Sequence, residues 1–108
     1  MPNKLERIQD PGLRRSLEEA HAALKAGDYR TVVEHASEAY AELLRRKPEM
    51  MQGAAQFRNV LFFPRLGAHL EVQPDGQPRV IYDRDKFIFS EAITYYEFAV
   101  DSLIKNEV

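Results

Sequence analysis

Two amphipathic segments separated by only two residues constrain the fold of this chain most. In "DPGLRRSLEEAHAALKAGD", Asp10 can cap a helix that starts at Pro11 and ends at Gly27. Asp28 can cap the next helix, "YRTVVEHASEAYAELLRRK", and Pro48 follows its end. Apolar residues recur at helical spacing in both segments, namely Leu13, Leu17, Ala20 and Leu24, then Val32, Val33, Ala36, Tyr40, Leu43 and Leu44. A turn this short predicts two antiparallel neighbouring helices.

The second half of the chain predicts two more helices with a β-hairpin between them. Residues 49 to about 62 keep a helical apolar period until Pro64 breaks it. In "QPDGQP", Pro74 and Gly76 suit the second and fourth positions of a type I turn. We therefore expect a β-hairpin over about residues 68–83, with an apolar face made of Leu70, Val72, Val80 and Tyr82. Ser90 then suits the N-cap of a final helix, "EAITYYEFAVDSLIKN".

These elements predict a mainly α fold, a four-helix antiparallel bundle with the β-hairpin inserted before the last helix. A chain of 108 residues, 44% of them hydrophobic, can bury one compact core. We expect residues 1–9 to form a tail and residues 10–108 to form a single helical domain. No segment reaches the length of an apolar membrane span, so we expect a cytoplasmic protein that does not contact a membrane.

The charge and the residue types narrow the range of ligands. Fifteen Lys and Arg residues against 17 Asp and Glu residues give a net charge of −2, which disfavours RNA unless a local site holds its phosphates. The chain has no cysteine, and we expect neither a metal nor a cofactor. Glu71, Asp83 and Asp85 lack the spacing of an EF-hand and are expected to form a charged loop. Arg30 and His35 lie about 140° apart around a helix, so we expect a solvated charge and a boundary histidine there.

The final helix carries more apolar surface than one packing partner requires. Its apolar residues cover about half of the circumference, and Phe98 lies outside this arc. They are Ala92, Ile93, Tyr95, Tyr96, Ala99, Val100, Leu103 and Ile104. We expect burial on two sides, the second by another copy of the chain, through an interface of Tyr95, Phe98 and Ser102 with Arg58 from the third helix.

Arg58 and Asn59 interrupt the apolar run "QFRNVLFF". The helical period places Arg58 within the apolar arc of the third helix and turns Asn59 away from it. Burial of an unpaired guanidinium would cost several kcal/mol. Arg58 is therefore expected to reach solvent, to pair with a carboxylate, or to serve an interface or a substrate.

The order of the elements, with "FRN" on the third helix and "FSEAITYYEFAVDSL" near the end, resembles the HEPN superfamily. Its members are small helical domains, commonly dimeric, and its metal-independent RNases carry an Arg, a polar residue and, a few residues later, a His. Under this resemblance Arg58 and Asn59 match, whereas Phe63, Pro64 or Arg65 stands in place of the His. Since none of these three transfers a proton near neutral pH, the resemblance implies a homodimeric interaction module without catalytic activity.

Two other functions stay open. His69, on the predicted β-hairpin, is the nearest histidine that could complete a metal-independent RNase with Arg58. The chain could instead be an adaptor that binds a helix of a partner protein in a groove beside Tyr95 and Phe98.

Overall fold

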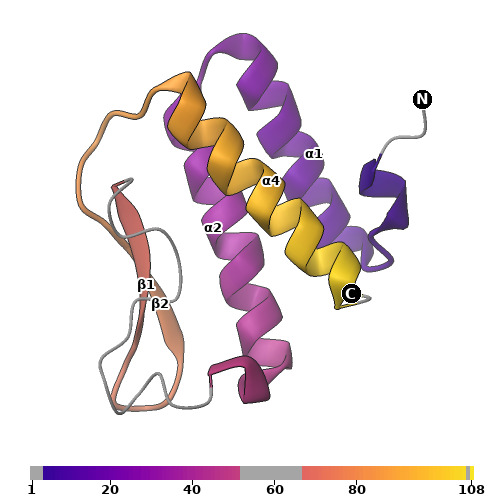
Figure 1. Ribbon diagram of the computed structural model, residues 1–108, viewed down its shortest axis with the longest axis vertical. Helices are drawn as coiled ribbons and strands as arrows, with labels where there is room; N and C mark the ends of the chain where they lie inside the picture. The colour runs from indigo at the N-terminus through magenta and orange to yellow at the C-terminus, as the bar shows by residue number, and fades with distance from the viewer. Residues whose placement is uncertain (1–3, 52–66, 107) are drawn as a thin grey trace.

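Three α-helices and a two-stranded β-hairpin make up the part of the chain that a computed structural model describes, residues 4–51, 67–106 and 108 (Figure 1). In chain order the elements are η1 (Lys4–Arg7), α1 (Pro11–Ala26), α2 (Tyr29–Arg46), η2 (Pro48–Met51), β1 (Ala68–Val72), β2 (Pro78–Tyr82) and α4 (Phe89–Lys105). The central element is α2, which contacts α1, α4 and both strands.

The predicted helical hairpin of α1 and α2 is confirmed. The Asp10 carboxylate accepts the Leu13 N–H at 2.9 Å at the start of α1, and Gly27 ends this helix with a φ of 79°. The Asp28 carboxylate accepts the Thr31 N–H at the start of α2. The apolar stripes of both helices enter the core, where Leu13, Leu17, Ala20, Val32, Val33, Ala36, Leu43 and Leu44 are buried.

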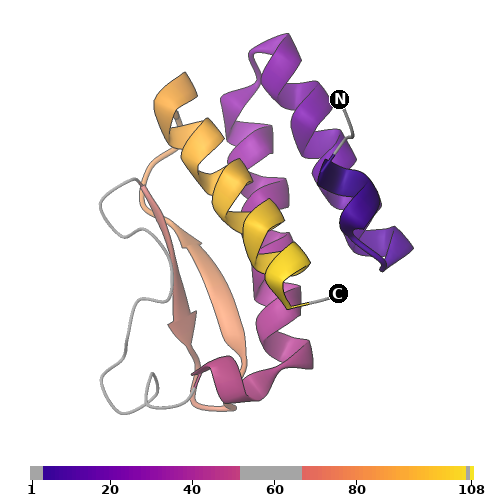
Figure 2. The same cartoon turned by 45° about the vertical axis from the view of Figure 1, so that its right-hand side comes forward.

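The predicted four-helix bundle is wrong. After α2 the chain forms the short 3-10 helix η2, and the remainder of the predicted third helix, residues 52–62, lies outside the described residues. The β-hairpin lies against α2 on the side opposite α1 (Figure 2). There the Arg45 guanidinium donates to the Pro78 carbonyl at 3.3 Å, and the Arg30 guanidinium lies 4.6 Å from the centre of the Tyr82 ring. A sheet surface therefore covers one side of α2, which the prediction of a four-helix bundle did not anticipate.

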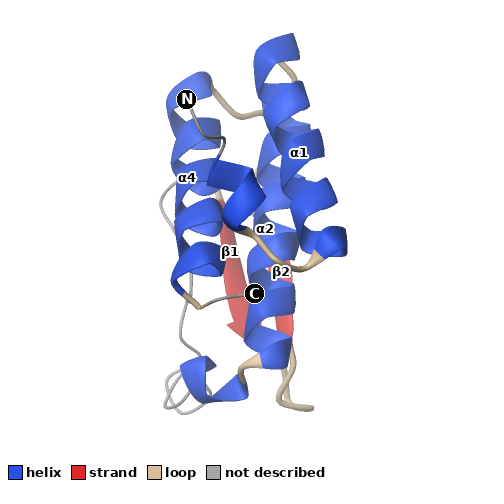
Figure 3. Ribbon diagram, turned by 90° about the vertical axis from the view of Figure 1, so that its right-hand side faces the viewer, coloured by secondary structure: helices blue, strands red, loops and turns tan. Residues whose placement is uncertain are grey.

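The β-hairpin itself is confirmed. Its strands are antiparallel, with Leu70 opposite Val80, and they lie behind the helices in a view from the α1 side (Figure 3). The Gly76 N–H donates to the Gln73 carbonyl at 2.8 Å, so Pro74 and Gly76 occupy the predicted second and fourth positions of the turn. Since side chains alternate between the faces of a strand, His69 and Glu71 project from the face opposite Leu70.

The final helix starts earlier than predicted, and Ser90 is not its N-cap. The first residue of α4 is Phe89, which leaves Ser90 exposed within the first turn. The buried Glu91 carboxylate accepts the Ile88 N–H at 3.0 Å. This contact satisfies an amide at the start of the helix, as the acidic residue of a capping box does.

The wide apolar face of α4 is used within one chain. The rings of Tyr96 and of His21 on α1 lie 5.8 Å apart, and Phe98 packs edge-on against Tyr40 of α2 at 5.0 Å. The residues between these flanks are buried, namely Ala92, Tyr95, Ala99, Val100 and Leu103. The width of this face therefore does not by itself require a second copy of the chain.

Candidate functional site

Three consecutive residues after β2 each form an ion pair with a different element of the fold. The pairs are Asp83 with His69 of β1, Arg84 with Glu91 of α4, and Asp85 with Arg30 of α2. We call residues 83–85 and these three partners the junction. It is the place where the β-hairpin is joined to both α2 and α4, so its charges determine how the hairpin is held.

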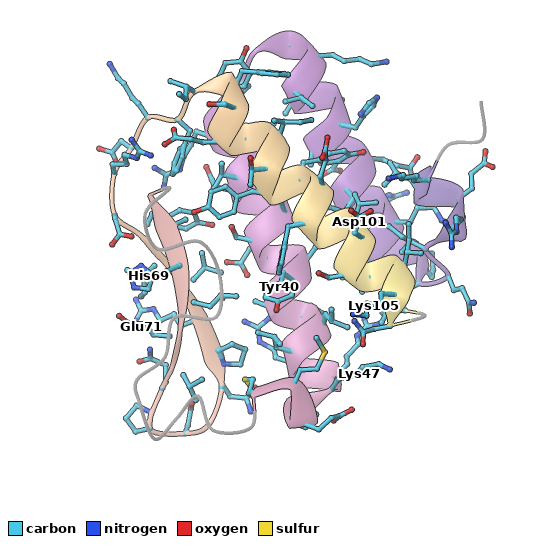
Figure 4. The ribbon with its side chains drawn as sticks, viewed as in Figure 1. Tyr40, Lys47, His69, Glu71, Asp101 and Lys105 are labelled. Carbon is cyan, nitrogen blue, oxygen red and sulfur yellow. The ribbon has the colours of Figure 1, made fainter. Side chains whose placement is uncertain are left out.

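His69 lies between two carboxylates on the outer face of the hairpin (Figure 4). Its Nδ1 is 2.8 Å from Asp83 Oδ2 and its Nε2 is 3.0 Å from Glu71 Oε1, and 13% of its side chain is exposed. Burial lowers the pKa of His69, but the hydrogen bonds to Glu71 and Asp83 and their charges outweigh burial and raise the pKa above 6.5. While it is charged, the imidazole donates from both nitrogens and offers no lone pair, so in that state it cannot act as a general base.

The Arg84 and Glu91 pair anchors the junction to α4. The Glu91 side chain is 11% exposed and accepts both from the Arg84 guanidinium and from the Ile88 N–H. The Arg84 guanidinium also lies 5.5 Å from the centre of the Phe87 ring, and this ring is buried. One carboxylate therefore holds the loop from Arg84 to Ile88 against the first turn of the helix.

Gly67 leaves the space that this pair requires. Its φ is 107°, a conformation that strains other residues, and a Cβ there would collide with Arg84 and lie 2.9 Å from Phe87. Its carbonyl accepts the Asp83 N–H at 2.7 Å. The start of β1 and the junction thus approach closely because position 67 has no side chain.

Arg30 joins the junction to α2. Its guanidinium donates to Glu34 at 3.0 Å and to the Asp85 carboxylate at 3.4 Å, and it stacks on Tyr82. Burial, followed by the charges of Glu38 and Glu34, raises the pKa of Tyr82, so its hydroxyl stays neutral.

The Arg30 and His35 spacing does not form a catalytic pair. His35 lies against α1, with its Nδ1 3.3 Å from Ser16 Oγ and its Nε2 3.5 Å from a Glu19 carboxylate oxygen. Arg30 faces the β-hairpin instead. The arginine is 33% exposed, so it is partly solvated as predicted, and it is also paired with carboxylates and stacked on Tyr82.

Of the other predicted site residues, Tyr95, Phe98 and Ser102 lie on α4. Arg58 and Asn59 lie outside the described residues, so their pairing with His69 stays a prediction. Tyr95 is fully buried, and its hydroxyl donates to the Ala68 carbonyl at 2.6 Å. This side chain belongs to the core and does not line an exposed groove or interface. Phe98 and Ser102 are partly exposed on α4 and remain candidates for a partner surface.

The acidic residues near the junction do not surround a common point. Asp83 and Glu71 contact opposite nitrogens of the His69 ring. Asp85 points to Arg30. Within residues 4–51, 67–106 and 108, no group of three His, Asp or Glu side chains is arranged to hold a metal ion.

Two exposed apolar side chains follow the junction, and the sequence patterns did not single them out. Ile88 is 62% exposed and Phe89 is 52% exposed, and they are the large hydrophobic residues most open to solvent in the described part of the chain. Phe89 contacts Tyr29 at the start of α2, with ring centres 6.0 Å apart. We call Tyr29, Ile88 and Phe89 the apolar tip. The signal for it was "KFIFS", where three consecutive apolar residues cannot all face one core.

Comparisons with known proteins leave the family of this chain open. No family model, no curated protein and no solved structure gives a significant match. Among the described residues, no helix has both the length and the apolar character needed to cross a membrane.

Proposed function

We propose that the protein is a HEPN-like helical interaction module without catalytic activity, and that it acts as a homodimer. The observation that carries the proposal is the apolar tip, where Ile88 and Phe89 are 62% and 52% exposed at the start of α4. Neighbouring exposed apolar side chains favour a protein contact because their burial is worth about 25 cal/mol per Å². A two-fold axis near this end of α4 would bring two tips together.

The state of His69 supports the absence of catalysis. An RNase that pairs Arg58 with His69 needs an imidazole that can exchange protons with the ribose 2′-hydroxyl. His69 is instead engaged by carboxylates at 2.8 and 3.0 Å on its two nitrogens. The HEPN-like part of the proposal rests on the sequence resemblance carried by Arg58 and Asn59.

Light scattering after size-exclusion chromatography tests self-association. We expect a dimer for the natural chain and a monomer for Phe89→Glu at the same concentration. Ala22→Glu is the matched control, because it adds the same charge at an exposed position of α1, and it should remain dimeric. A monomeric natural chain, or a Phe89→Glu variant that stays dimeric, would overturn the dimer.

Cleavage assays on RNA in the presence of a chelator test whether the protein lacks catalytic activity. We expect no turnover by the natural chain. Cleavage by the natural chain that disappears in both Arg58→Ala and His69→Ala would overturn the proposal of a non-catalytic protein and would establish a metal-independent RNase that uses these two residues. Absorbance at 260 nm on the chromatographic peak reports whether RNA is bound even when it is not cut.

A further inference from the structure

His69 closes the end of the β-hairpin at which β1 begins and β2 ends. Its side chain reaches Asp83, which is the first residue after β2, at 2.8 Å. The backbone closes the same end, because the Asp83 N–H donates to the Gly67 carbonyl at 2.7 Å. The two residues that follow Asp83 attach this end to α4 and α2. A change in the charge of His69 therefore acts next to the ion pairs that attach the hairpin to α4 and α2.

Few charged groups surround this imidazole in the described part of the chain. From its own strand it faces Glu71, and from the residue after β2 it faces Asp83. Its cross-strand partner in β2 is the uncharged Ile81, whereas the next pair along the strands sets Glu71 opposite Arg79. Tyr95 is the titratable group of α4 that lies nearest to this strand, with its hydroxyl bound to the backbone next to His69, at Ala68.

The remaining charges of the junction are engaged elsewhere. Arg84 pairs with Glu91 of α4, and Asp85 pairs with Arg30 of α2. Within residues 4–51, 67–106 and 108, His69 is the cationic group that contacts both Glu71 and Asp83, while Arg79 lies opposite Glu71 across the strands.

The two contacts of His69 require two donors. The imidazolium ion has an N–H on each ring nitrogen, whereas the neutral ring has only one. After loss of the proton, one lone pair would face a carboxylate, and that contact must break. Glu71 is the partner expected to leave, because its side chain is 47% exposed and can turn into water. Asp83 is also held through its backbone N–H.

We propose that His69 is a pH-sensitive clasp of the β-hairpin, closed on both carboxylates when the imidazole is charged and partly released when it is neutral. A raised pKa in the folded state means that this stabilisation is complete below pH 6.5 and is lost as the pH rises through the higher folded value. The clasp rests on contacts within one chain and does not depend on self-association or on the proposed function.

Nuclear magnetic resonance tests the clasp on the natural chain. We expect the His69 ring to titrate above pH 6.5. Through the same titration, the protection factor of the Asp83 amide should fall by about tenfold, because the His69 contact that Asp83 keeps loses its charge assistance when the ring becomes neutral. Protection of the Val33 amide, in the buried part of α2, should not change. The clasp would be overturned if the His69 ring titrated at or below pH 6.5, or if the protection factor of the Asp83 amide did not change through the titration.

Two pairs of variants separate the clasp from general destabilisation. His69→Gln should remove the pH dependence of Asp83 protection, whereas His35→Gln, which alters a histidine beside Glu19 of α1, should keep it. Glu71→Gln preserves the side-chain shape and removes one charge, so it should lower the pH at which His69 titrates. The matched control is Glu18→Gln, at an exposed position of α1, and it should leave the titration unchanged.

The Glu71→Gln variant keeps the test decisive if His69→Gln does not fold. An unchanged His69 titration in Glu71→Gln would contradict the clasp. Protection of the Asp83 amide that still depends on pH in His69→Gln would contradict it as well.

Discussion

The α1 and α2 helical hairpin begins with contacts between residues close together in the chain, whereas the junction joins residues far apart. The carboxylates of Asp10 and Asp28 each accept the backbone N–H of the residue three positions later and so cap the helix that follows. The helices then pack through fully buried side chains such as Leu17 and Leu43. At the junction, Asp85 lies 55 residues from Arg30, and each ion pair joins an exposed side chain to one that is at most 33% exposed.

This difference predicts different responses to the solvent. Apolar burial is insensitive to pH and salt, whereas exposed ion pairs are weak and screened. The helical layer should therefore supply most of the stability, and the junction should decide the position and local opening of the β-hairpin. Four substitutions, in order of decreasing expected loss of stability, test whether the helical layer and the junction differ in this way.

Leu43→Ala tests the helical layer. Leu43 is fully buried on α2, so the cavity and the lost apolar contacts should lower the free energy of unfolding by about 3 kcal/mol. Denaturation by urea measures this loss. Leu43→Met, which conserves volume, should cost less than about 1.5 kcal/mol. A loss below about 1 kcal/mol for Leu43→Ala would show that the layer does not dominate stability.

Gly67→Ala tests the close approach at the junction. The new methyl group would displace Arg84 and Phe87 at a positive φ, so we expect a loss of about 2 kcal/mol in unfolding free energy. Gly76→Ala also has a positive φ but meets nothing within 4 Å, so it should cost only about 1 kcal/mol. Equal losses in the two variants would contradict a steric role for Gly67.

Tyr95→Phe tests the link between the β-hairpin and α4. The buried hydroxyl bonds to both the N–H and the carbonyl of Ala68, at 3.0 and 2.6 Å, so its removal should cost about 1.5 kcal/mol. Thermal and urea unfolding would measure the change. Tyr96→Phe is the control on the same helix and should change stability by less than about 0.5 kcal/mol. If both variants lost the same unfolding free energy, the hydrogen bonds of Tyr95 to Ala68 would not contribute specifically to stability.

Asp28→Ala tests the local signals of the helical hairpin. Loss of the side-chain acceptor for the Thr31 N–H should cost about 1 kcal/mol, whereas Asp28→Asn retains a cap and should stay within a few tenths of the natural stability. If the two variants unfolded alike, the cap would not contribute, and the start of α2 would depend on packing alone.

The parts of the fold that were predicted correctly have short-range signals. Asp10, Gly27 and Asp28 bound α1 and α2 through their own hydrogen bonds and backbone conformation, and Gly76 closes the β-turn in the same way. Ser90 was the wrong N-cap although its residue type is favoured there. Glu91 satisfies the first amide instead, and the start of the helix moves toward the junction.

The four-helix bundle failed for a different reason. A helical period predicts which side chains share a face, but it does not predict which element packs against that face. One side of α2 is covered by the β-hairpin, through contacts such as that of Arg30 with Tyr82. The wide apolar face of α4 led to the prediction of a second copy of the chain. Within one chain, His21 and Tyr40 contact the flanks of this face and Ala68 contacts Tyr95 at its centre, and the dimer itself stays a prediction.

The candidate site shows the same division between sequence and structure. His69 was singled out as a substitute catalytic group, and Glu71, Asp83 and Asp85 as a charged loop. Their pairing could not be read from the sequence, since 14 residues separate His69 from Asp83. Arg58 and Asn59 lie outside the described residues, so their role stays a prediction.

Caps, turns and apolar periods act over a few neighbouring positions, so they were enough to predict the helical hairpin, the β-turn and the apolar stripes of α1 and α2. They did not predict that Leu5 and Ile8, in the expected tail, enter the core. Only the tertiary structure decided that the β-hairpin lies against α2, that His69 sits between Glu71 and Asp83, and that Ile88 and Phe89 remain exposed. The physical reason is that a charged or apolar side chain accepts many partners of suitable chemistry. Which partner it meets depends on how the whole chain packs.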